Sequence, residues 1–360
     1  MTTEVSWLPA HPSYASISML RYAQLLEEVR QENDEFRCEL LINPEIGERA
    51  GKWQRQLHRR LLYPLKIRHS LKGRIAHVLD HSWADLLSHV PKGAAKVVTV
   101  HDLNPLRFPG ELTAAQVARF RSWVEHIRDA DAIIADSTYT KNETSELLDI
   151  DPESISVVFA GAAAPPKGEI PITRVTSELA ALNGRFLVGN IGSILQRKNI
   201  GILPDAIAIA KKMTGLDISV VRAGQMLPEK LRNEFQKQLG EKGLIELGHV
   251  TNPELEDFYR MVDCICVPSL YEGFGLPVIE AMIRSKPVIV AETSSLPEVG
   301  GDAALYFDPH SPEALAKALV KILDNSTREQ LITAGLQRVA SFTWRNTLEG
   351  FYSTYRQLIS

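Results

Sequence analysis

Two glutamates separated by seven residues enclose a glycine-containing segment in the second half of the chain. Glu272 and Glu280 lie on either side of Gly-Phe-Gly-Leu-Pro-Val-Ile, which follows an apolar run and opens a predicted helix. Gly273 and Gly275 allow a tight turn and a close approach of backbone to a ligand. N–H groups at the start of a helix attract an anion, and a carboxylate accepts hydrogen bonds from vicinal hydroxyls such as those of a ribose. Taken alone, the segment equally fits a glycine turn with two solvated glutamates.

A second segment combines glycine with two adjacent cations. Gly192 and Ser193 follow a predicted strand, and Arg197 and Lys198 come just before a predicted helix. Two cations beside a flexible backbone can neutralise a diphosphate. The glycine spacing matches neither the dinucleotide pattern G-x-G-x-x-G nor the P-loop. By itself the segment also fits an exposed Arg-Lys pair before a helix.

Short apolar runs alternate with stretches of helical periodicity along the whole chain. This alternation predicts parallel sheets with helices on both faces, and two successive series predict two doubly wound domains. Residues 160–176 carry three prolines and no periodicity, as an interdomain linker does. Ligands bind at the carboxyl ends of such strands, so a cleft between two facing domains is the expected site. The expected strands are 5–8, 38–42, 75–79, 96–100, 132–135, 155–159, 186–191, 218–222, 245–247, 264–267, 288–291 and 305–307, and the clearest expected helices are 17–31, 113–128, 138–148 and 343–359.

The composition is that of a globular protein larger than one ordinary domain. The chain has 360 residues, of which 44% are hydrophobic and 23% charged, and its net charge of -4 argues against a nucleic-acid binder. Its cysteines, Cys38, Cys264 and Cys266, are too few for a disulfide framework and favour a reducing compartment. We expect the closely spaced pair to be buried apolar residues and not metal ligands. No run reaches the ~18 apolar residues of a membrane span, and the first residues do not resemble a signal peptide. We therefore expect a cytoplasmic protein, or one held only peripherally at the cytoplasmic face of a membrane.

Together, and in this order, the two segments resemble the nucleotide-sugar site of glycosyltransferase family 4. The resemblance includes the Glu272-x7-Glu280 spacing, the phosphate loop 192–199, and the segments 100–103, 130–137, 248–250 and 295–304. The family implies an α/β fold of the GT-B type, with two Rossmann-like doubly wound domains facing a central cleft. The expected domains are an acceptor-side domain over 1–165, a nucleotide-sugar-binding domain over 166–342, and a C-terminal helix over 343–360 that packs back toward the first domain.

The resemblance also implies roles for individual residues. Arg197 and Lys198 would hold the donor diphosphate, and Glu280 the ribose hydroxyls. Glu272 would hold the transferred sugar together with backbone amides, and His101 would reach toward the sugar and the acceptor, which makes these two the expected catalytic residues. Val250 would lie near the nucleobase through its backbone. The full expected donor-binding set is Gly192, Ser193, Arg197, Lys198, Val250, Phe274, Gly275, Leu276 and Glu280.

The implied activity is the transfer of a mannose- or glucose-type hexose from a GDP- or UDP-sugar to a glycan, glycolipid or other acceptor hydroxyl. The family retains the anomeric configuration and needs no cofactor or essential metal. No carboxylate pair of the glycosidase kind is apparent for a double displacement, so attack on the front face of the sugar is the expected route. Two alternatives stay open from the sequence: a GT-B nucleotide-sugar epimerase, and a non-catalytic protein that binds a sugar nucleotide or a partner protein.

The chain departs from the family pattern at two places. Many members carry a glycine-rich loop after the first strand, but here the segment from Ala10 to Met19 has no glycine. Contacts carried by that loop are therefore not transferable, and acceptor specificity with them. Ser193 occupies the position of an arginine after the phosphate-loop glycine, so Arg197 is the candidate to supply that charge.

A basic stretch follows the second expected strand. Residues 49–74 contain nine Lys and Arg and no Asp or Glu, with Trp53, Leu57 and Leu61 four apart and arginines such as Arg59 on other faces. Such a segment fits contact with an anionic membrane or a lipid-phosphate acceptor. It also fits a surface helix whose apolar edge packs on the first domain and which Pro64 ends early.

Overall fold

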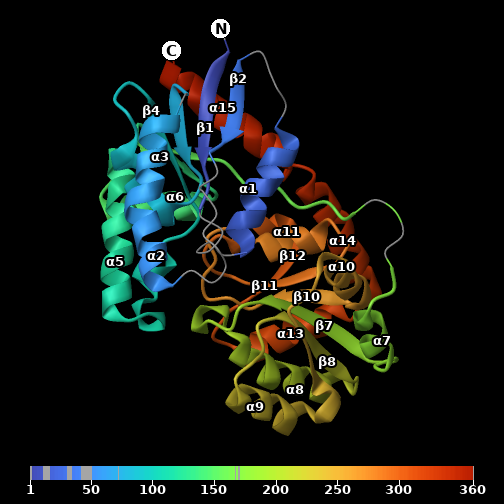
Figure 1. Ribbon diagram of the computed structural model, residues 1–360. Helices are drawn as coiled ribbons and strands as arrows, with labels where there is room; N and C mark the ends of the chain where they lie inside the picture. The colour runs from blue at the N-terminus through green and yellow to red at the C-terminus, as the bar shows by residue number, and fades with distance from the viewer. Residues whose placement is uncertain are drawn as a thin grey trace. The chain divides into compact units, whose positions relative to one another are not determined.

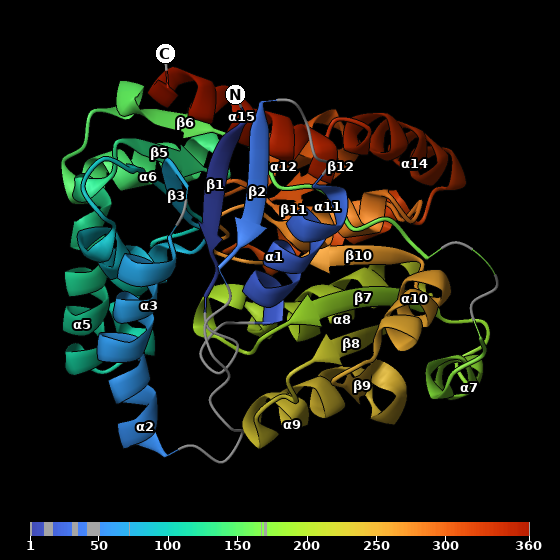
Figure 2. The same ribbon diagram turned by 45° about the horizontal axis from the view of Figure 1, so that its top comes forward.

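The computed structural model describes residues 2–10, 17–30, 35–41, 51–71, 73–166, 168 and 171–359. The chain divides into two compact units, one formed by residues 1–161 with 344–360 and the other by residues 162–343. Each contains one six-stranded sheet, and the two sheets with their helices are drawn in Figures 1 and 2.

The first unit contains a parallel sheet in the order β2-β1-β3-β4-β5-β6. All four residues of β3 and the last four of β4 are buried, as expected of inner strands covered on both faces. The strands are β1 (Thr3–Leu8), β2 (Phe36–Leu40), β3 (Ile75–Val78), β4 (Ala95–Val100), β5 (Ala132–Ala135) and β6 (Ile155–Val157), and the α-helices are α1 (Ile17–Val29), α2 (Lys52–Leu57), α3 (Tyr63–Ser70), α4 (Asn104–Arg107), α5 (Ala114–Val124), α6 (Thr138–Leu148) and α15 (Trp344–Ile359).

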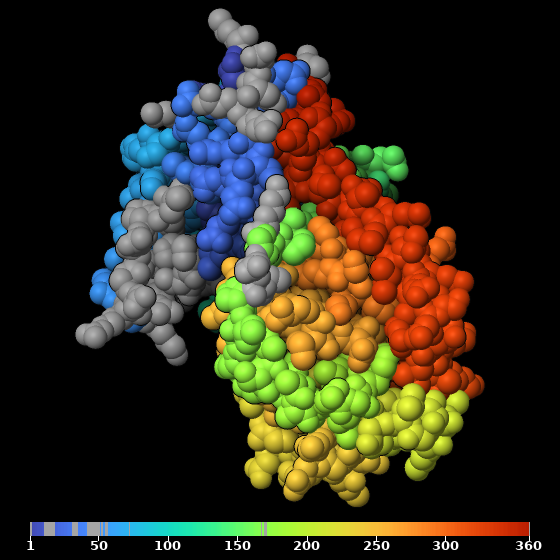
Figure 3. Space-filling view, turned by 90° about the vertical axis from the view of Figure 1, so that its right-hand side faces the viewer, coloured from blue at the N-terminus to red at the C-terminus, as the bar shows by residue number. Residues whose placement is uncertain are grey.

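The second unit repeats this architecture with the order β12-β11-β10-β7-β8-β9, again parallel throughout. Figure 3 shows part of its surface, where the orange-red atoms include α14, in which only Leu331, Gly335 and Val339 are buried. The strands are β7 (Phe186–Gly192), β8 (Ile218–Gly224), β9 (Leu244–Gly248), β10 (Cys264–Val267), β11 (Val288–Ala291) and β12 (Ala304–Phe307), and the α-helices are α7 (Arg174–Ala180), α8 (Leu203–Thr214), α9 (Glu229–Leu239), α10 (Asn252–Met261), α11 (Leu276–Met282), α12 (Leu296–Gly300), α13 (Pro312–Ile322) and α14 (Asn325–Val339).

Helix α15 joins the first unit through buried aromatic residues. The Tyr355 hydroxyl lies 3.0 Å from Trp7 Nε1 and 2.6 Å from His77 Nδ1, and the Tyr352 ring stacks on Phe36. His77 Nε2 contacts Thr99 Oγ1 at 2.8 Å. Burial lowers the pKa of His77 to about 3, so the imidazole is neutral. These contacts fix the C-terminal helix against β1, β2 and β3, beside which it is drawn in Figure 2.

The structure of the basic stretch differs from the sequence expectation at two points. Pro64 does not end the helix: a π-helical turn, His58–Leu62, joins α2 to α3, and Pro64 lies in the first turn of α3. The wider π turn accommodates a ring that otherwise collides with the carbonyl four residues earlier. The apolar edge does not pack on the unit either, because Trp53 is 73% and Leu61 48% exposed.

The helical run is held to the first unit by its opposite face. His58, Tyr63 and Ile67 are buried. The guanidinium of Arg59 lies 4.1 Å from the Trp83 ring and 3.7 Å from the Trp123 ring, and also donates to Asp85 and to the Ser82 carbonyl. Residues 49, 50 and 72 of the stretch lie outside the described residues, as do residues 11–16 of the glycine-free loop. No helix in the described part of the chain is long and apolar enough to span a bilayer.

Candidate functional site

The strand order in the sheet of the second unit reverses between β7 and β10, although all strands stay parallel. The strands β8 and β9 follow β7 on one side, whereas β10 pairs with β7 on the other. Open α/β sheets bind ligands at the carboxyl ends of the strands beside such a reversal. The loop after β7 (193–199) and the loop after β10 (268–275) both begin at this edge. The two strongest sequence signals therefore meet at one place in the fold.

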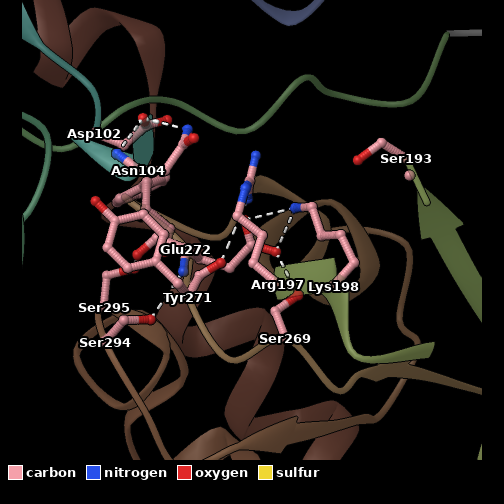
Figure 4. A network of polar contacts seen from close by, with 12 residues as sticks. Asp102, Asn104, Ser193, Arg197, Lys198, Ser269, Tyr271, Glu272, Ser294 and Ser295 are labelled. Atoms are coloured by element: carbon pink, nitrogen blue, oxygen red, sulfur yellow. Dashed lines mark hydrogen bonds and ion pairs between the residues drawn. The ribbon is translucent and has the colours of Figure 1, made fainter. Parts of the chain in front are cut away.

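Lys198 and Glu272 form a partly buried ion pair between these two loops. Lys198 Nζ lies 2.6 Å from Glu272 Oε1 and 2.8 Å from Oε2, and the two side chains are 17% and 10% exposed. Figure 4 shows them pointing toward one another, with Ser269 beside them and Ser193 farther away. An ammonium has three donors, so contact with both carboxylate oxygens leaves one for a further anion.

Serine hydroxyls fix the position of Glu272. Ser269 Oγ donates to Glu272 Oε1 at 2.7 Å, and Ser294 Oγ accepts the Glu272 backbone N–H at 3.0 Å. Ser295 Oγ lies 2.9 Å from the Glu272 carbonyl and 2.7 Å from the Phe274 carbonyl. Ser294 has a φ of 51°, a left-handed conformation that costs a non-glycine residue about 1 kcal/mol. Hydrogen bonds to the three serines thus fix the position of the Glu272 carboxylate and backbone.

The cationic loop is tied to the loop after β10 by one backbone hydrogen bond and by side-chain contacts to backbone carbonyls. The Leu270 N–H donates to the Arg197 carbonyl at 2.7 Å, and Asn199 Nδ2 donates to the Pro268 carbonyl at 3.1 Å. Asn199 has a φ of 52°, and this left-handed residue turns the chain toward α8. Arg197 Nη1 approaches the Tyr271 carbonyl at 3.5 Å. Both cations of the predicted phosphate loop therefore lie beside the segment that carries Glu272.

Helix α11 begins immediately after the second glycine of the motif. Gly275 has a φ of 108°, and a Cβ there would lie 3.0 Å from Leu296, so the position requires glycine. Pro277 has no N–H, and the Val278 N–H donates to the Gly275 carbonyl. In the described part of the chain, the amides of Gly275 and Leu276 donate to no protein group. These two amides can donate to an anion at this turn.

The remaining donor residues lie on other elements of the same unit. Glu280, half-buried on α11, accepts a hydrogen bond from the Tyr259 hydroxyl at 3.1 Å. It does not join the Lys198–Glu272 pair. Val250 follows β9, at the far edge of the sheet from β10, and directly precedes the α10 capping box of Thr251. No group of three potential metal-binding side chains occurs among the residues that the structure places.

His101 lies in the first unit, directly after β4, and is buried. Its Nδ1 is 3.0 Å from Asp136 Oδ2, and its Nε2 is 2.8 Å from the Leu79 carbonyl oxygen. A carbonyl only accepts, so Nε2 carries a proton, and Nδ1 shares the second proton with the carboxylate. Burial alone lowers the pKa of His101, but the Asp136 hydrogen bond and charge outweigh it and raise this pKa to about 9. The imidazole is therefore a cation at neutral pH, with both nitrogens bonded within its own unit.

The His101–Asp136 pair predicts a loss of stability at alkaline pH. The pKa of His101 is about 9 in the folded protein, against the ordinary value of 6.5 that applies in the unfolded chain. Its stabilisation is complete below pH 6.5 and disappears as the pH rises through 9, by about 3 kcal/mol. We expect the free energy of unfolding, measured by urea titration, to fall over this range in the wild type and much less in His101→Gln. Equal slopes in the two proteins would show that the imidazole is not held as a cation.

Several residues of the site carry no sequence signal. Ser269, Ser294 and Ser295 hold Glu272, yet serine in a loop is too common to single out. Tyr259 reaches Glu280 from α10, and only the three-dimensional structure brings them together. Asp136 belongs to a segment that matched the family, but its pairing with His101 depends on the parallel neighbours β4 and β5.

Comparisons with known proteins identify the family of the chain. Residues 174–338 match the model of the glycosyl transferases group 1, and residues 27–162 match that of Glycosyltransferase Family 4. The chain belongs to the group 1 glycosyltransferases. It is therefore an enzyme that transfers sugars, as the sequence predicted.

Relatives of this glycosyltransferase include the O-antigen chain mannosyltransferase B of Escherichia coli, 28% identical over 307 residues that cover 79% of each chain. The D-inositol 3-phosphate glycosyltransferase of Corynebacterium diphtheriae is 26% identical over 299 residues, which cover 79% of this chain and 68% of the relative.

Solved structures confirm the GT-B fold. Sucrose-phosphate synthase from Thermosynechococcus elongatus matches with a TM-score of 0.75 at 18% identity over 99% of both chains. Anabaena HepE, solved in complex with UDP and glucose, matches with a TM-score of 0.70 at 17% identity, over 99% of this chain and 100% of its own.

Proposed function

We propose that this glycosyltransferase moves a hexose from a nucleotide-diphosphate sugar to a hydroxyl of a glycan, glycolipid or related acceptor, with retention of configuration. The observation that carries the proposal is the Lys198–Glu272 pair at the sheet reversal, because it places a cation for a diphosphate beside a carboxylate for a sugar. A mannosyltransferase among the relatives favours a mannose donor, with GDP-mannose as the first candidate and UDP-glucose as the second.

The proposed roles follow from charge and reach. Arg197 and Lys198 contact the diphosphate, with Gly192 and Ser193 lining it. Glu272 holds the transferred sugar, assisted by the Phe274, Gly275 and Leu276 backbone. Two further residues complete the set: Glu280 accepts hydrogen bonds from the ribose hydroxyls, and Val250 borders the base.

The proposed reaction is a front-face substitution. As the bond from the anomeric carbon to the diphosphate oxygen breaks, negative charge grows on that oxygen and positive charge on the sugar ring. Preorganised cations and amides stabilise the first charge. The acceptor oxygen bonds to the anomeric carbon from the face that the diphosphate leaves, and its proton passes to the departing phosphate. The catalytic role that we propose for His101 is electrostatic and depends on the positive charge of its imidazolium. The proposed reaction uses no metal ion or other cofactor.

The test is a product assay with purified protein, a panel of sugar nucleotides and lipid-linked or soluble glycan acceptors. We expect one donor to be consumed only when acceptor is present, and the proton NMR spectrum of the product to show the anomeric configuration of the donor. Consumption of donor alone, with formation of an epimer, would favour the epimerase alternative. An inverted product would rule out front-face attack.

We also propose that the enzyme contacts an anionic membrane surface through the helical run 52–70. Trp53, Leu57, Leu61, Leu62 and Leu65 are exposed there, between 36% and 73%. Exposed Arg60 belongs to the same run, which has no acidic residue. A helix with an exposed apolar edge and cationic flanks lies at a bilayer interface, and anionic lipid attracts each cation.

This proposal predicts binding to anionic vesicles that weakens with salt. We expect the wild type to sediment with vesicles containing phosphatidylglycerol and not with purely zwitterionic vesicles. Trp53→Ser and Leu61→Ser should each reduce the bound fraction severalfold, because both side chains lie on the exposed edge. The matched control is Leu336→Ser, which removes an apolar side chain that is 43% exposed on α14. Equal sedimentation of all four proteins would contradict the proposal.

A further inference from the structure

A buried arginine lies beneath the predicted diphosphate loop. Arg222, near the end of β8, is only 2% exposed. Its Nη1 donates to Asn190 Oδ1 at 2.5 Å, and its Nη2 contacts the carbonyls of Gly192, Ser193 and Gln225 at 2.8, 3.0 and 3.1 Å. All four partners are neutral oxygens. One guanidinium thus holds the loop after β7 and the loop after β8 together.

The charge of Arg222 is not neutralised by a bonded carboxylate. Glu246, on the neighbouring β9, attracts it, but the carboxylate oxygens of Glu246 accept from the Leu227 N–H and from Arg232. Burial lowers the pKa of Arg222 to about 10, with Glu246 opposing the shift, so the side chain stays charged at neutral pH. Arg222 Nε is buried without a hydrogen-bond partner among the residues described. An apolar side chain would be far cheaper to bury at this position, so the fold alone does not require the cation.

The carbonyl contacts determine where two amides point. In a trans peptide the C=O and N–H bonds point in opposite directions. The Gly192 and Ser193 carbonyls face Arg222, so the N–H groups of Ser193 and Ile194 face away from it. Both residues are half-buried, and neither N–H has a hydrogen-bond partner in the part of the chain that the structure describes. Successive amides directed to one side form an anion-binding concavity.

The loop after β8 prevents the carbonyls from turning away. Gly192 and Gly224 are partners in the β7–β8 register, with φ values of 131° and 121°. A Cβ on Gly224 would lie 2.3 Å from the Gly192 carbonyl oxygen. The Gln225 N–H donates to this same oxygen at 3.3 Å. Glycine at both positions allows the close approach, and Arg222 then fixes the orientation of the peptides.

We infer that Arg222 is a positioning residue for the diphosphate of the donor. It orients the Ser193 and Ile194 amides toward the phosphate oxygens and adds a positive charge beneath them. This inference rests on the proposed donor site and adds to it a residue that does not touch the substrate. It assigns part of the phosphate affinity to a side chain on β8, outside both motifs of the sequence.

The test compares diphosphate binding in Arg222→Met, Arg222→Lys and a matched control. Arg185 is the control because it bonds Ser219 Oγ and the Ile218 carbonyl at the opposite end of the same strand pair. The probe is whichever of UDP, GDP, ADP and CDP the wild type binds, with the corresponding nucleoside titrated in competition. We expect Arg222→Met to weaken diphosphate binding about tenfold or more and to leave nucleoside binding unchanged. Arg185→Met should change neither.

Arg222→Lys keeps the charge but offers one donor group in place of the fork, so it should bind the diphosphate severalfold more weakly than the wild type. Hydrogen exchange of the peptide covering residues 190–196 should be faster in both Arg222 variants. If Arg222→Met does not fold, Arg222→Lys decides the question. Diphosphate affinity equal to that of the wild type in the variants that fold, or an equal loss in Arg185→Met, overturns the inference. A wild type that binds none of the four nucleotides would instead overturn the proposed donor site.

Discussion

Glu272→Gln should lower kcat about 100-fold while the protein remains folded. The carboxylate accepts from Lys198 through both oxygens and from Ser269 through one. The amide of glutamine has nearly the same shape but is neutral, and its NH2 group would face the Lys198 ammonium. The sugar would therefore lose a fixed charged acceptor at the moment when positive charge develops on its ring. Initial rates at saturating donor and acceptor measure the effect.

The matched control for this change is Glu256→Gln. Glu256 is a buried glutamate of the same unit that accepts hydrogen bonds from Arg284 at 2.5 and 2.8 Å. Its replacement should lower the melting temperature without a comparable fall in kcat. A Glu272→Gln enzyme with wild-type kcat would remove Glu272 from the catalytic set.

Lys198→Met should weaken binding of the donor nucleotide by roughly ten- to a hundredfold, because it removes a charge-assisted contact worth about 1.5–3 kcal/mol. It also leaves Glu272 without its cation, and an unpaired carboxylate at this depth repels a diphosphate. The double variant Lys198→Met/Glu272→Gln should therefore bind the nucleotide more tightly than Lys198→Met alone. Isothermal titration calorimetry of the three proteins measures this coupling.

The control here is Lys211→Met. Lys211 lies on α8, and its ammonium is paired with the Asp217 carboxylate at 3.1 Å. This substitution should leave nucleotide affinity unchanged. Additive effects of the Lys198 and Glu272 substitutions would show that the two side chains act independently and would argue against their shared role at the site.

The sheets could be predicted from the sequence because their signal is local. Every strand expected from an apolar run is present, with ends shifted by a few residues, as at β8, which continues to Gly224. Short buried runs such as β10 are apolar on both faces, as parallel strands covered by helices require. The glycine turn at Gly275 and the cations at Arg197 and Lys198 were likewise visible, since they depend on neighbouring residues.

The rest of the site could not be predicted, because it depends on contacts between segments far apart in the chain. Arg222 lies within a strand of buried residues, and no motif or residue spacing in the sequence singles it out as a functional residue. Ser294 contributes through a left-handed backbone that no sequence rule requires of serine. Pro64 was expected to end its helix, but the preceding π turn accommodates it. In each case a tertiary or backbone arrangement overrides the local preference.

The most direct test of the proposed donor site is a calorimetric titration of the purified protein with UDP, GDP, ADP and CDP, repeated on Glu280→Ala. Glu280 is half-buried and accepts a hydrogen bond from the Tyr259 hydroxyl, and a carboxylate is the acceptor that the two ribose hydroxyls require. We expect one nucleotide to bind the wild type and Glu280→Ala to bind it about tenfold more weakly, with an unchanged melting temperature. Wild-type affinity in Glu280→Ala, or no binding of any nucleotide to the wild type, would contradict the donor site described at the β7–β10 reversal.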